Sequence, residues 1–201
     1  MILSKKYAIL FVAIQKTGTT SIEKTLQGYL SPHVVYGITN IKHRKSFRYK
    51  HNSAEMLYNY PEIIDLWDQL FKFSFVRNPW DLCASHFFYR QRGGKYKEAI
   101  DITFKEWLIN DKKREPIIWQ APTQYDCLTV NGDLAMDFVG KFENLQNDFN
   151  EVCKHIEIPP IQLDHLNSTK HGHYSTYYDQ EAKEYVGDLF KKDIEYFNYE
   201  F

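Results

Sequence analysis

The pattern of apolar and polar residues changes between strand and helix periods along the chain. An uninterrupted apolar run at residues 8–14 predicts a strand buried on both faces, and the mainly apolar segments 71–76 and 138–142 predict two further core strands. Between and after these runs, apolar residues recur every three or four positions, as in helices that cover a sheet. Strands that alternate with helices predict an α/β fold with a central, mostly parallel sheet flanked by helices.

Capping residues place the ends of the predicted helices. A helical pattern follows Gly18 and stops at Ser31-Pro32, and Pro61 and Pro79 are suited to the first turn of two further helices. Side chains suited to capping precede the other helical patterns, namely Ser53, Asn78, Thr103 with Glu106, Asn144 and Asp179. Val34 to Tyr36 predicts a short strand. We expect one domain over residues 1–201, because no linker, repeat or low-complexity tract interrupts the pattern.

Composition narrows the class of protein. The 201 residues carry a formal net charge of −1, which argues against a general nucleic-acid binder. The three cysteines lack metal-ligand spacing and predict reduced core residues. No apolar run approaches the ~20 residues that span a bilayer, and residues 1–6 show no cleavable signal. We therefore expect a soluble, cytoplasmic protein.

The first buried strand leads into a polar loop, Gln15-Lys16-Thr17-Gly18-Thr19-Thr20-Ser21. Gly18 permits a tight turn, and the backbone N–H groups of the following helix would converge with the loop hydroxyls and the Lys16 ammonium. Such a set of donors favours a phosphate-like anion. In the usual nucleoside-triphosphate loop, lysine follows the second glycine, whereas here Lys16 precedes Gly18.

A second anion site is predicted where the strand at 71–76 ends. This strand leads into Arg77, at a position where a triphosphate kinase would need a magnesium-binding acidic residue. A cation at this position suits a further phosphate on the ligand. Ser85, eight residues later in the predicted helix, could donate a hydrogen bond to the same phosphate. The alternative for Arg77 is an ion pair that flanks the helix.

Five segments, taken in order, resemble the sulfotransferases that use 3′-phosphoadenosine 5′-phosphosulfate (PAPS). Residues 15–21 resemble the family's 5′-phosphosulfate loop, and Phe75 to Pro79 through Ser85 resemble its 3′-phosphate motif. Lys50 to Glu55, Gln124, and Asp137 to Leu145 are similar to the carbohydrate-type, bacterial branch. Three further stretches extend the resemblance over essentially the whole chain, namely Asn167-Ser168 with Tyr174, Tyr177 to Asp179, and Phe197 to Phe201. The resemblance implies a single P-loop-like, three-layer domain. Gln15 stands where the family commonly has proline.

The resemblance implies in-line transfer of a sulfuryl group to an acceptor hydroxyl or amine, without a metal. Lys16 is expected to contact the bridging oxygen on which negative charge grows. His51 is the expected general base, with His43 and Glu55 as alternatives. The expected cofactor-binding residues are Gln15, Lys16, Thr17, Gly18, Thr19, Thr20, Ser21, Arg77, Ser85 and Lys170, with His173 as the alternative to Lys170.

The acceptor is expected to be a glycan or a small hydroxyl compound. A basic segment at residues 42–50, which includes Arg48 and Lys50, suits an acidic or polyhydroxylated acceptor, although an ordinary solvated loop explains it equally well. Gln124 and Tyr125 are further candidates for the acceptor side. Two other functions stay open at this point: a nucleotide or small-molecule kinase, and a non-catalytic nucleotide- or glycan-binding module.

Overall fold

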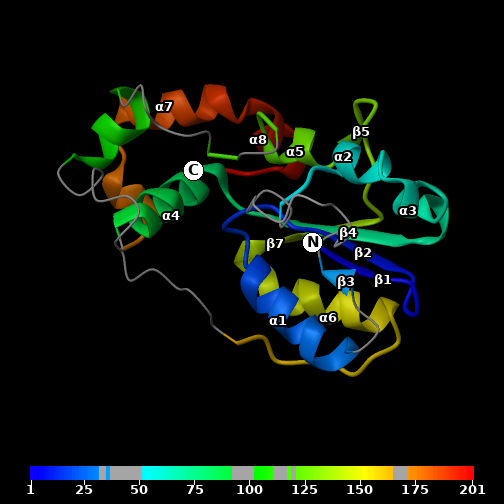
Figure 1. Cartoon of the computed structure of the whole chain (residues 1–201). Helices are drawn as coiled ribbons and strands as arrows, with labels where there is room; N and C mark the ends of the chain where they lie inside the picture. Colours follow the sequence, from blue (N-terminus) through cyan, green and yellow to red (C-terminus); the bar gives the residue numbers. More distant parts are fainter. Residues whose placement is uncertain (32–34, 37–50, 92–101, 111–116, 119–120, 165–171) are drawn as a thin grey trace.

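A five-stranded sheet in the order β3-β1-β2-β4-β7 forms the centre of the molecule (Figure 1). The computed structural model describes residues 1–31, 35–36, 51–91, 102–110, 117–118, 121–164 and 172–201. β2, β4 and β7 lie parallel, so their carboxyl ends meet at one edge of the sheet. β1 runs antiparallel to both β2 and β3. The strands are β1 (Ile2–Ser4), β2 (Ile9–Val12), β3 (Val35–Tyr36), β4 (Phe71–Val76) and β7 (Phe138–Lys141).

Helices cover both faces of this sheet, which makes the expected three layers (Figure 1). One face is covered by α1 (Thr19–Leu30) and α6 (Leu145–His155). The other carries α2 (Ala54–Tyr58), α3 (Pro61–Ile64), the 3₁₀ turn η2 (Trp67–Gln69), α5 (Gln124–Cys127) and the hairpin of β5 (Thr129–Val130) and β6 (Asp133–Leu134). The mixed α/β architecture agrees with the prediction from the apolar pattern.

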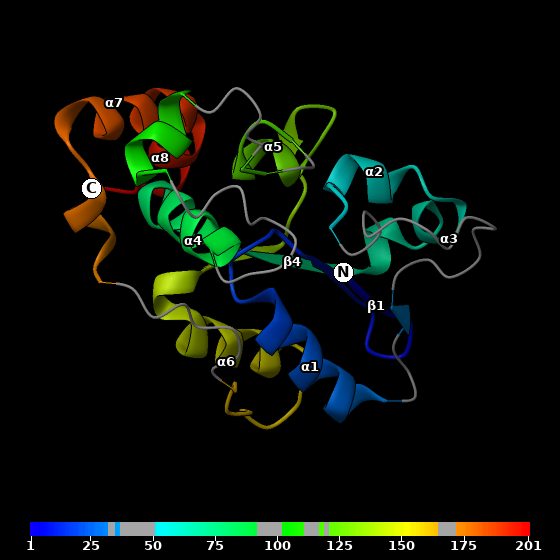
Figure 2. The same cartoon turned by 60° about the vertical axis from the view of Figure 1, so that its left-hand side comes forward.

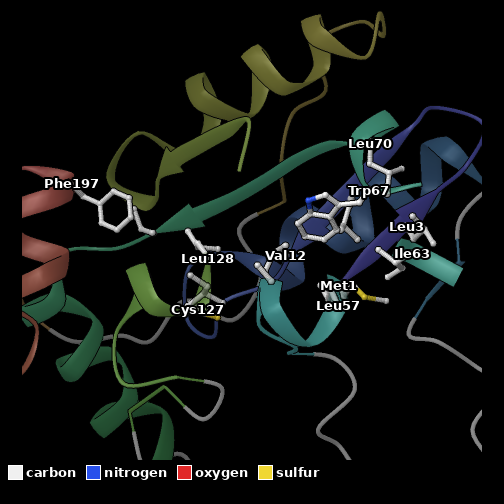
Figure 3. Close-up of a cluster of buried hydrophobic side chains, with 14 of the residues drawn as sticks. Met1, Leu3, Val12, Leu57, Ile63, Trp67, Leu70, Cys127, Leu128 and Phe197 are labelled. Carbon is white, nitrogen blue, oxygen red and sulfur yellow. The ribbon is translucent and has the colours of Figure 1, made fainter. Parts of the chain in front are cut away.

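Alternation along the strands explains why both faces are covered. Ile9 and Phe11 of β2 pack in one cluster with α1 and α6, whereas Leu10 and Val12 belong to a second cluster on the opposite face. Figure 3 shows part of this second cluster, in which Val12 lies close to side chains of α2 and to Leu128. β2 has two buried faces and is apolar throughout, whereas the two polar residues of β4, Lys72 and Ser74, are buried with hydrogen bonds to backbone carbonyl oxygens.

A third group of helices lies beyond the carboxyl ends of the strands. It contains α4, α7 and α8 together with two short helical segments, Glu106–Asn110 and Tyr174–Tyr177, and Figure 2 shows α7 and α8 packed over α4. Trp80, Phe87 and Trp107 anchor its core. The bounds are α4 (Pro79–Gln91), the π-helix η4 (Glu106–Asn110), the 3₁₀ turns η5 (Phe142–Asn144) and η6 (Tyr174–Tyr177), α7 (Gln180–Leu189) and α8 (Lys191–Phe197).

Several predicted boundaries are confirmed. Ser53 Oγ accepts a hydrogen bond from Met56 N, and Asp179 Oδ1 accepts one from Ala182 N. The carbonyl oxygen of the Asn78 side chain accepts from Trp80 N, and Thr103 and Glu106 form a reciprocal capping box. The three free cysteines, Cys83, Cys127 and Cys153, are buried as expected.

Other predictions need correction. The sequence did not predict β1, which follows directly on the N-terminal residue, or the β5–β6 hairpin. Asn144 does not cap α6, because its side chain bonds to Asp148 and Asn147 instead. The single C-terminal helix expected after Asp179 is two helices, α7 and α8, that meet at Phe190. That buried phenylalanine belongs to the core around α4, so tertiary packing coincides with the break.

Candidate functional site

The two predicted anion motifs meet at the edge where β2 and β4 end. Because the two strands are adjacent and parallel, their following loops leave the sheet side by side. A direct bond joins these loops: Arg77 Nη1 donates to the carbonyl oxygen of Lys16 at 2.9 Å, across 61 residues of sequence. The two loops for which the sequence predicts anion binding therefore lie side by side and can act as one site.

The anion loop has a backbone that depends on glycine. Gly18 occupies the N-cap position of α1 with φ of 80°, in the left-handed region. A Cβ at this position would lie 2.7 Å from Leu145 Cδ2 of α6, so the loop packs tightly on that helix. Lys16 also has a positive φ, 64°, and Thr17 Oγ1 donates to the carbonyl oxygen of Ile14 at 2.9 Å. The first N–H groups of a helix have no acceptor from a preceding turn, so the start of α1 beside this loop suits an anion.

Two side chains add donors to this loop. The Lys16 ammonium lies 4.0 Å from the ring centroid of Tyr89 on α4, so it spans the space between the loop and that helix. Gln15 is only 5% exposed, and its Nε2 has no hydrogen-bond partner within the described part of the chain. A buried amide without a partner costs free energy, which a bound acceptor group would recover.

Arg77 is held in a defined orientation. Arg77 is only 7% exposed. Its Nε donates to Asp81 Oδ2 at 2.8 Å, and its guanidinium carbon lies 4.0 Å from the ring centroid of Phe142. The helix-flanking ion pair considered from the sequence is thus present, as Arg77–Asp81. A guanidinium has five N–H groups. Asp81 and Lys16 take one each, and the others suit a bound anion.

The position of His51 defines its tautomer. Its Nδ1 lies 2.9 Å from the carbonyl oxygen of Ala13, the residue directly after β2. A carbonyl oxygen only accepts hydrogen bonds, so Nδ1 is the protonated nitrogen in this contact, and in the neutral ring Nε2 is the nitrogen that can accept a proton. His51 is half-buried, which leaves it accessible beside the anion loop. In the neutral ring, this tautomer is the one in which Nε2 can act as a general base.

His86 is a site residue that the sequence did not indicate. It is buried on α4, and its Nε2 has no hydrogen-bond partner among the described residues. Burial, followed by the positive charges of Lys16, Arg90 and Arg77, lowers the pKa of His86 well below its ordinary value. The neutral imidazole thus lies in a cationic cluster. The available signals were its place directly after Ser85 and four residues before Arg90 in a helix.

Asn78, the residue after Arg77, is braced by η5 and by the C-terminal residues. Asn78 N donates to Glu143 Oε1 at 2.7 Å, and Asn78 Nδ2 donates to the carbonyl oxygen of Glu200 at 2.7 Å. Tyr199 Oη donates to the other carboxylate oxygen of Glu143 at 3.3 Å, and burial raises the pKa of Tyr199. Two segments far from Asn78 in the sequence thus hold the residue next to Arg77.

The comparison with known families decides the classification. Residues 1–200 match the model of a family described as the sulfotransferase family. The chain belongs to this family. A protein of Archaeoglobus fulgidus, described as an uncharacterized protein, is 29% identical over 94 residues, which are 47% of this chain and 73% of the relative. Its description names no activity, so the family match alone supports sulfotransfer chemistry.

Three other predicted site residues of this sulfotransferase-family chain lie in different surroundings. Ser85 is buried on α4, next to His86. Gln124 is fully buried and bonds to the backbone of Arg77, which makes it a support of Arg77 rather than a group open to an acceptor. The ring of Tyr125 packs 4.6 Å from that of Tyr196, between α5 and α8.

Some candidates lie outside the described residues, namely His43, Arg48, Lys50 and Lys170. Glu55, the reserve base, is tied to the β5–β6 hairpin, because its Oε2 accepts from Asn131 N at 2.7 Å. His173 lies near the start of η6 and bonds to Ser175. Within the described ranges, no group of three or more His, Cys, Asp or Glu side chains is arranged to hold a metal ion. No helix in those same ranges has the length and apolar character needed to cross a bilayer.

Proposed function

We propose that this protein transfers a sulfuryl group from PAPS to a hydroxyl, or an amine, of a carbohydrate or glycoconjugate acceptor. The bond from Arg77 to the Lys16 carbonyl oxygen carries the proposal, because it joins a phosphosulfate-type loop and a second cationic position in one site. PAPS has two anionic ends, at its 5′ and 3′ positions, and would match both. Family membership supports the reaction class.

The residues present fit such a donor. Gln15 to Ser21 would hold the 5′ end through backbone N–H groups, hydroxyls and the Lys16 ammonium. Arg77 and Ser85, together with Lys170, would hold the 3′-phosphate. The unpartnered Nε2 of Gln15 and the cationic cluster around His86 support an anionic ligand at this edge. When bound, PAPS would supply a sulfuryl group already attached to a phosphate leaving group.

His51 is proposed as the general base. Its Nε2 lone pair would accept the proton of the acceptor hydroxyl, while Nδ1 stays bonded to the Ala13 carbonyl oxygen. That hydrogen bond would orient the ring and stabilise the imidazolium that forms. In Ser-His-Asp sites, a carboxylate bonded to Nδ1 of the histidine base has the same effect. Lys16 would hold the bridging oxygen of the donor. A transferring sulfuryl group carries less charge than a phosphoryl group, so lysine, N–H groups and hydroxyls suffice to bind it.

The acceptor class rests on the resemblance to carbohydrate sulfotransferases and on the basic segment that includes Arg48 and Lys50. If this segment binds an acidic glycan, raised salt should weaken acceptor binding and leave PAPS binding less affected. Acceptor binding that does not respond to salt would contradict this part of the proposal.

Thermal-shift measurements test the donor. We expect adenosine 3′,5′-bisphosphate to raise the melting temperature without magnesium, because a ligand that binds the native state stabilises it. Stabilisation by ATP with magnesium alone would indicate a kinase instead. Transfer of labelled sulfate from PAPS to a panel of glycans, lipids and small hydroxyl compounds then tests turnover. Binding of the bisphosphate without transfer to any acceptor would support a non-catalytic module.

A further inference from the structure

A buried hydrogen-bond chain connects the C-terminal helix α8 to the backbone of Arg77. Asp193 Oδ2 accepts from Gln124 Nε2 at 3.1 Å and from Gln124 N at 3.0 Å, and Asp193 Oδ1 accepts from Tyr125 N at 2.7 Å. Gln124 Oε1 in turn accepts from Arg77 N at 2.8 Å, and Nε2 donates to Arg77 O at 2.8 Å. Figures 1 and 2 show α5, which carries Gln124, beside α8.

The chemistry of Asp193 determines which way the amide of Gln124 faces. An ionised carboxylate only accepts hydrogen bonds, so the NH₂ end of the amide must face Asp193. The carbonyl end then faces the N–H of Arg77, and the amide pairs with the Arg77 backbone by two bonds, as a neighbouring strand would. Arg77 follows directly after β4, where no strand continues the ladder.

Burial shows that this arrangement is costly unless its bonds are made. Asp193 and Gln124 are both 0% exposed. Burial raises the pKa of Asp193 to about 6, whereas the bonds from Tyr125 and Gln124 act in the opposite direction. A buried carboxylate that relies on three N–H donors constrains the position of each donor, because losing one leaves a charged oxygen unpaired.

We propose that Asp193 is a positioning residue for Arg77, acting through Gln124. By holding the backbone of Arg77, it places the guanidinium between Asp81, Phe142 and the Lys16 carbonyl oxygen, ready for the 3′-phosphate. This inference rests on the proposed function, because it takes the 3′-phosphate as the ligand of Arg77. No motif in the sequence links Asp193 to the site.

A double-mutant cycle tests the proposal, with isothermal titration of adenosine 3′,5′-bisphosphate as the readout. Asp193→Asn places an NH₂ group against an N–H donor and should weaken binding by about tenfold, which is the loss expected from one displaced charge-assisted bond. In an Arg77→Ala background, the same change should have little further effect, because the residue that Asp193 positions is gone. An equal loss in both backgrounds would overturn the proposal.

Asp126→Asn is the matched control. Asp126 also joins α5 to α8, through Lys192 Nζ at 2.7 Å, but it has no bond to Gln124 or Arg77 among the described contacts. Asp126→Asn should leave bisphosphate affinity unchanged. A loss as large as that of Asp193→Asn would show that the effect comes from the contact between α5 and α8 in general.

If Asp193→Asn does not fold, the cycle is run with Gln124→Asn, whose shorter amide cannot reach Arg77. Wild-type affinity in that variant would overturn the proposal.

The control and the cycle also separate this inference from the proposed function. If the wild-type protein does not bind the bisphosphate at all, the proposed donor is wrong. If it binds with normal affinity in the Asp193 and Gln124 variants, the donor assignment stands and only the positioning role fails.

Discussion

The imidazole Nδ1 of His51 lies 2.9 Å from the carbonyl oxygen of Ala13, a residue 38 positions earlier in the chain. This contact brings the predicted base to the strand that leads into the anion loop. It also assigns the proton to Nδ1, since the carbonyl oxygen cannot donate. In the neutral ring, Nε2 is then the nitrogen that can accept a proton, as the proposed role of general base requires.

The first prediction concerns this histidine. His51→Asn retains an N–H group close to the position of Nδ1 but supplies no base, so the fold and bisphosphate affinity should persist. Turnover should fall by roughly 10²–10⁴-fold, the usual contribution of a general base. His155→Asn, an exposed histidine at the opposite edge of the sheet, is the control and should keep full activity. Full turnover in His51→Asn would move the role of base to His43 or Glu55.

The second prediction concerns Arg77. Arg77→Lys keeps the charge but loses the planar fork, and the lysine cannot reproduce the bonds to Asp81 and the Lys16 carbonyl oxygen together. Affinity for adenosine 3′,5′-bisphosphate should fall about tenfold, in line with the loss of one hydrogen bond to a charged group. Affinity for adenosine 5′-monophosphate, which lacks the 3′-phosphate, should stay as in the wild type. Equal losses for both ligands would argue against a 3′-phosphate contact.

The third prediction compares two glycines of the same segment. Gly18→Ala combines a left-handed φ with a 2.7 Å contact to Leu145 and should lower the free energy of unfolding by about 1–3 kcal/mol. Gly28 lies inside α1 with open space around it, so Gly28→Ala should raise stability by roughly 0.5–1 kcal/mol. Denaturant unfolding of both variants measures these changes. A stable Gly18→Ala protein would show that the loop can take another backbone form.

The fourth prediction concerns the pH dependence of stability. The pKa of His86 is lowered in the folded protein, so below the ordinary histidine pKa of about 6.5 the unfolded chain binds more protons. Stability should therefore fall as pH drops below this value, and His86→Gln should lose less stability over the same range. The raised pKa of Asp193 acts in the opposite direction between pH 3.8 and about 6, so the difference between variant and wild type isolates His86.

Thermal unfolding at several pH values checks this prediction. His155→Gln serves as the control for replacing a histidine with glutamine, because that residue is exposed and stacks on Phe71 at the start of β4. A His86→Gln profile parallel to that of the wild type would show that His86 does not titrate between the folded and unfolded states.

Much of the fold was predictable because local rules decided it. β4 spans the predicted residues 71–76, α1 starts after Gly18 and ends before Pro32, and the caps at Ser53 and Asp179 are present. Where packing overrides local preference, prediction from the sequence was incomplete. The break at Phe190 coincides with a contact to the α4 core, and β1 depends on pairing with β2 and β3.

For the site, the sequence by itself determined the residues of the two anion motifs, since the order of strand, loop and capping residue is encoded locally. It also suggested His51. Only the tertiary structure decided how these residues meet: the parallel pairing of β2 with β4 places Lys16 beside Arg77, and the Ala13 carbonyl oxygen selects the tautomer of His51. Gln124, His86 and Asp193 received their roles from contacts across distant segments, which no local pattern records.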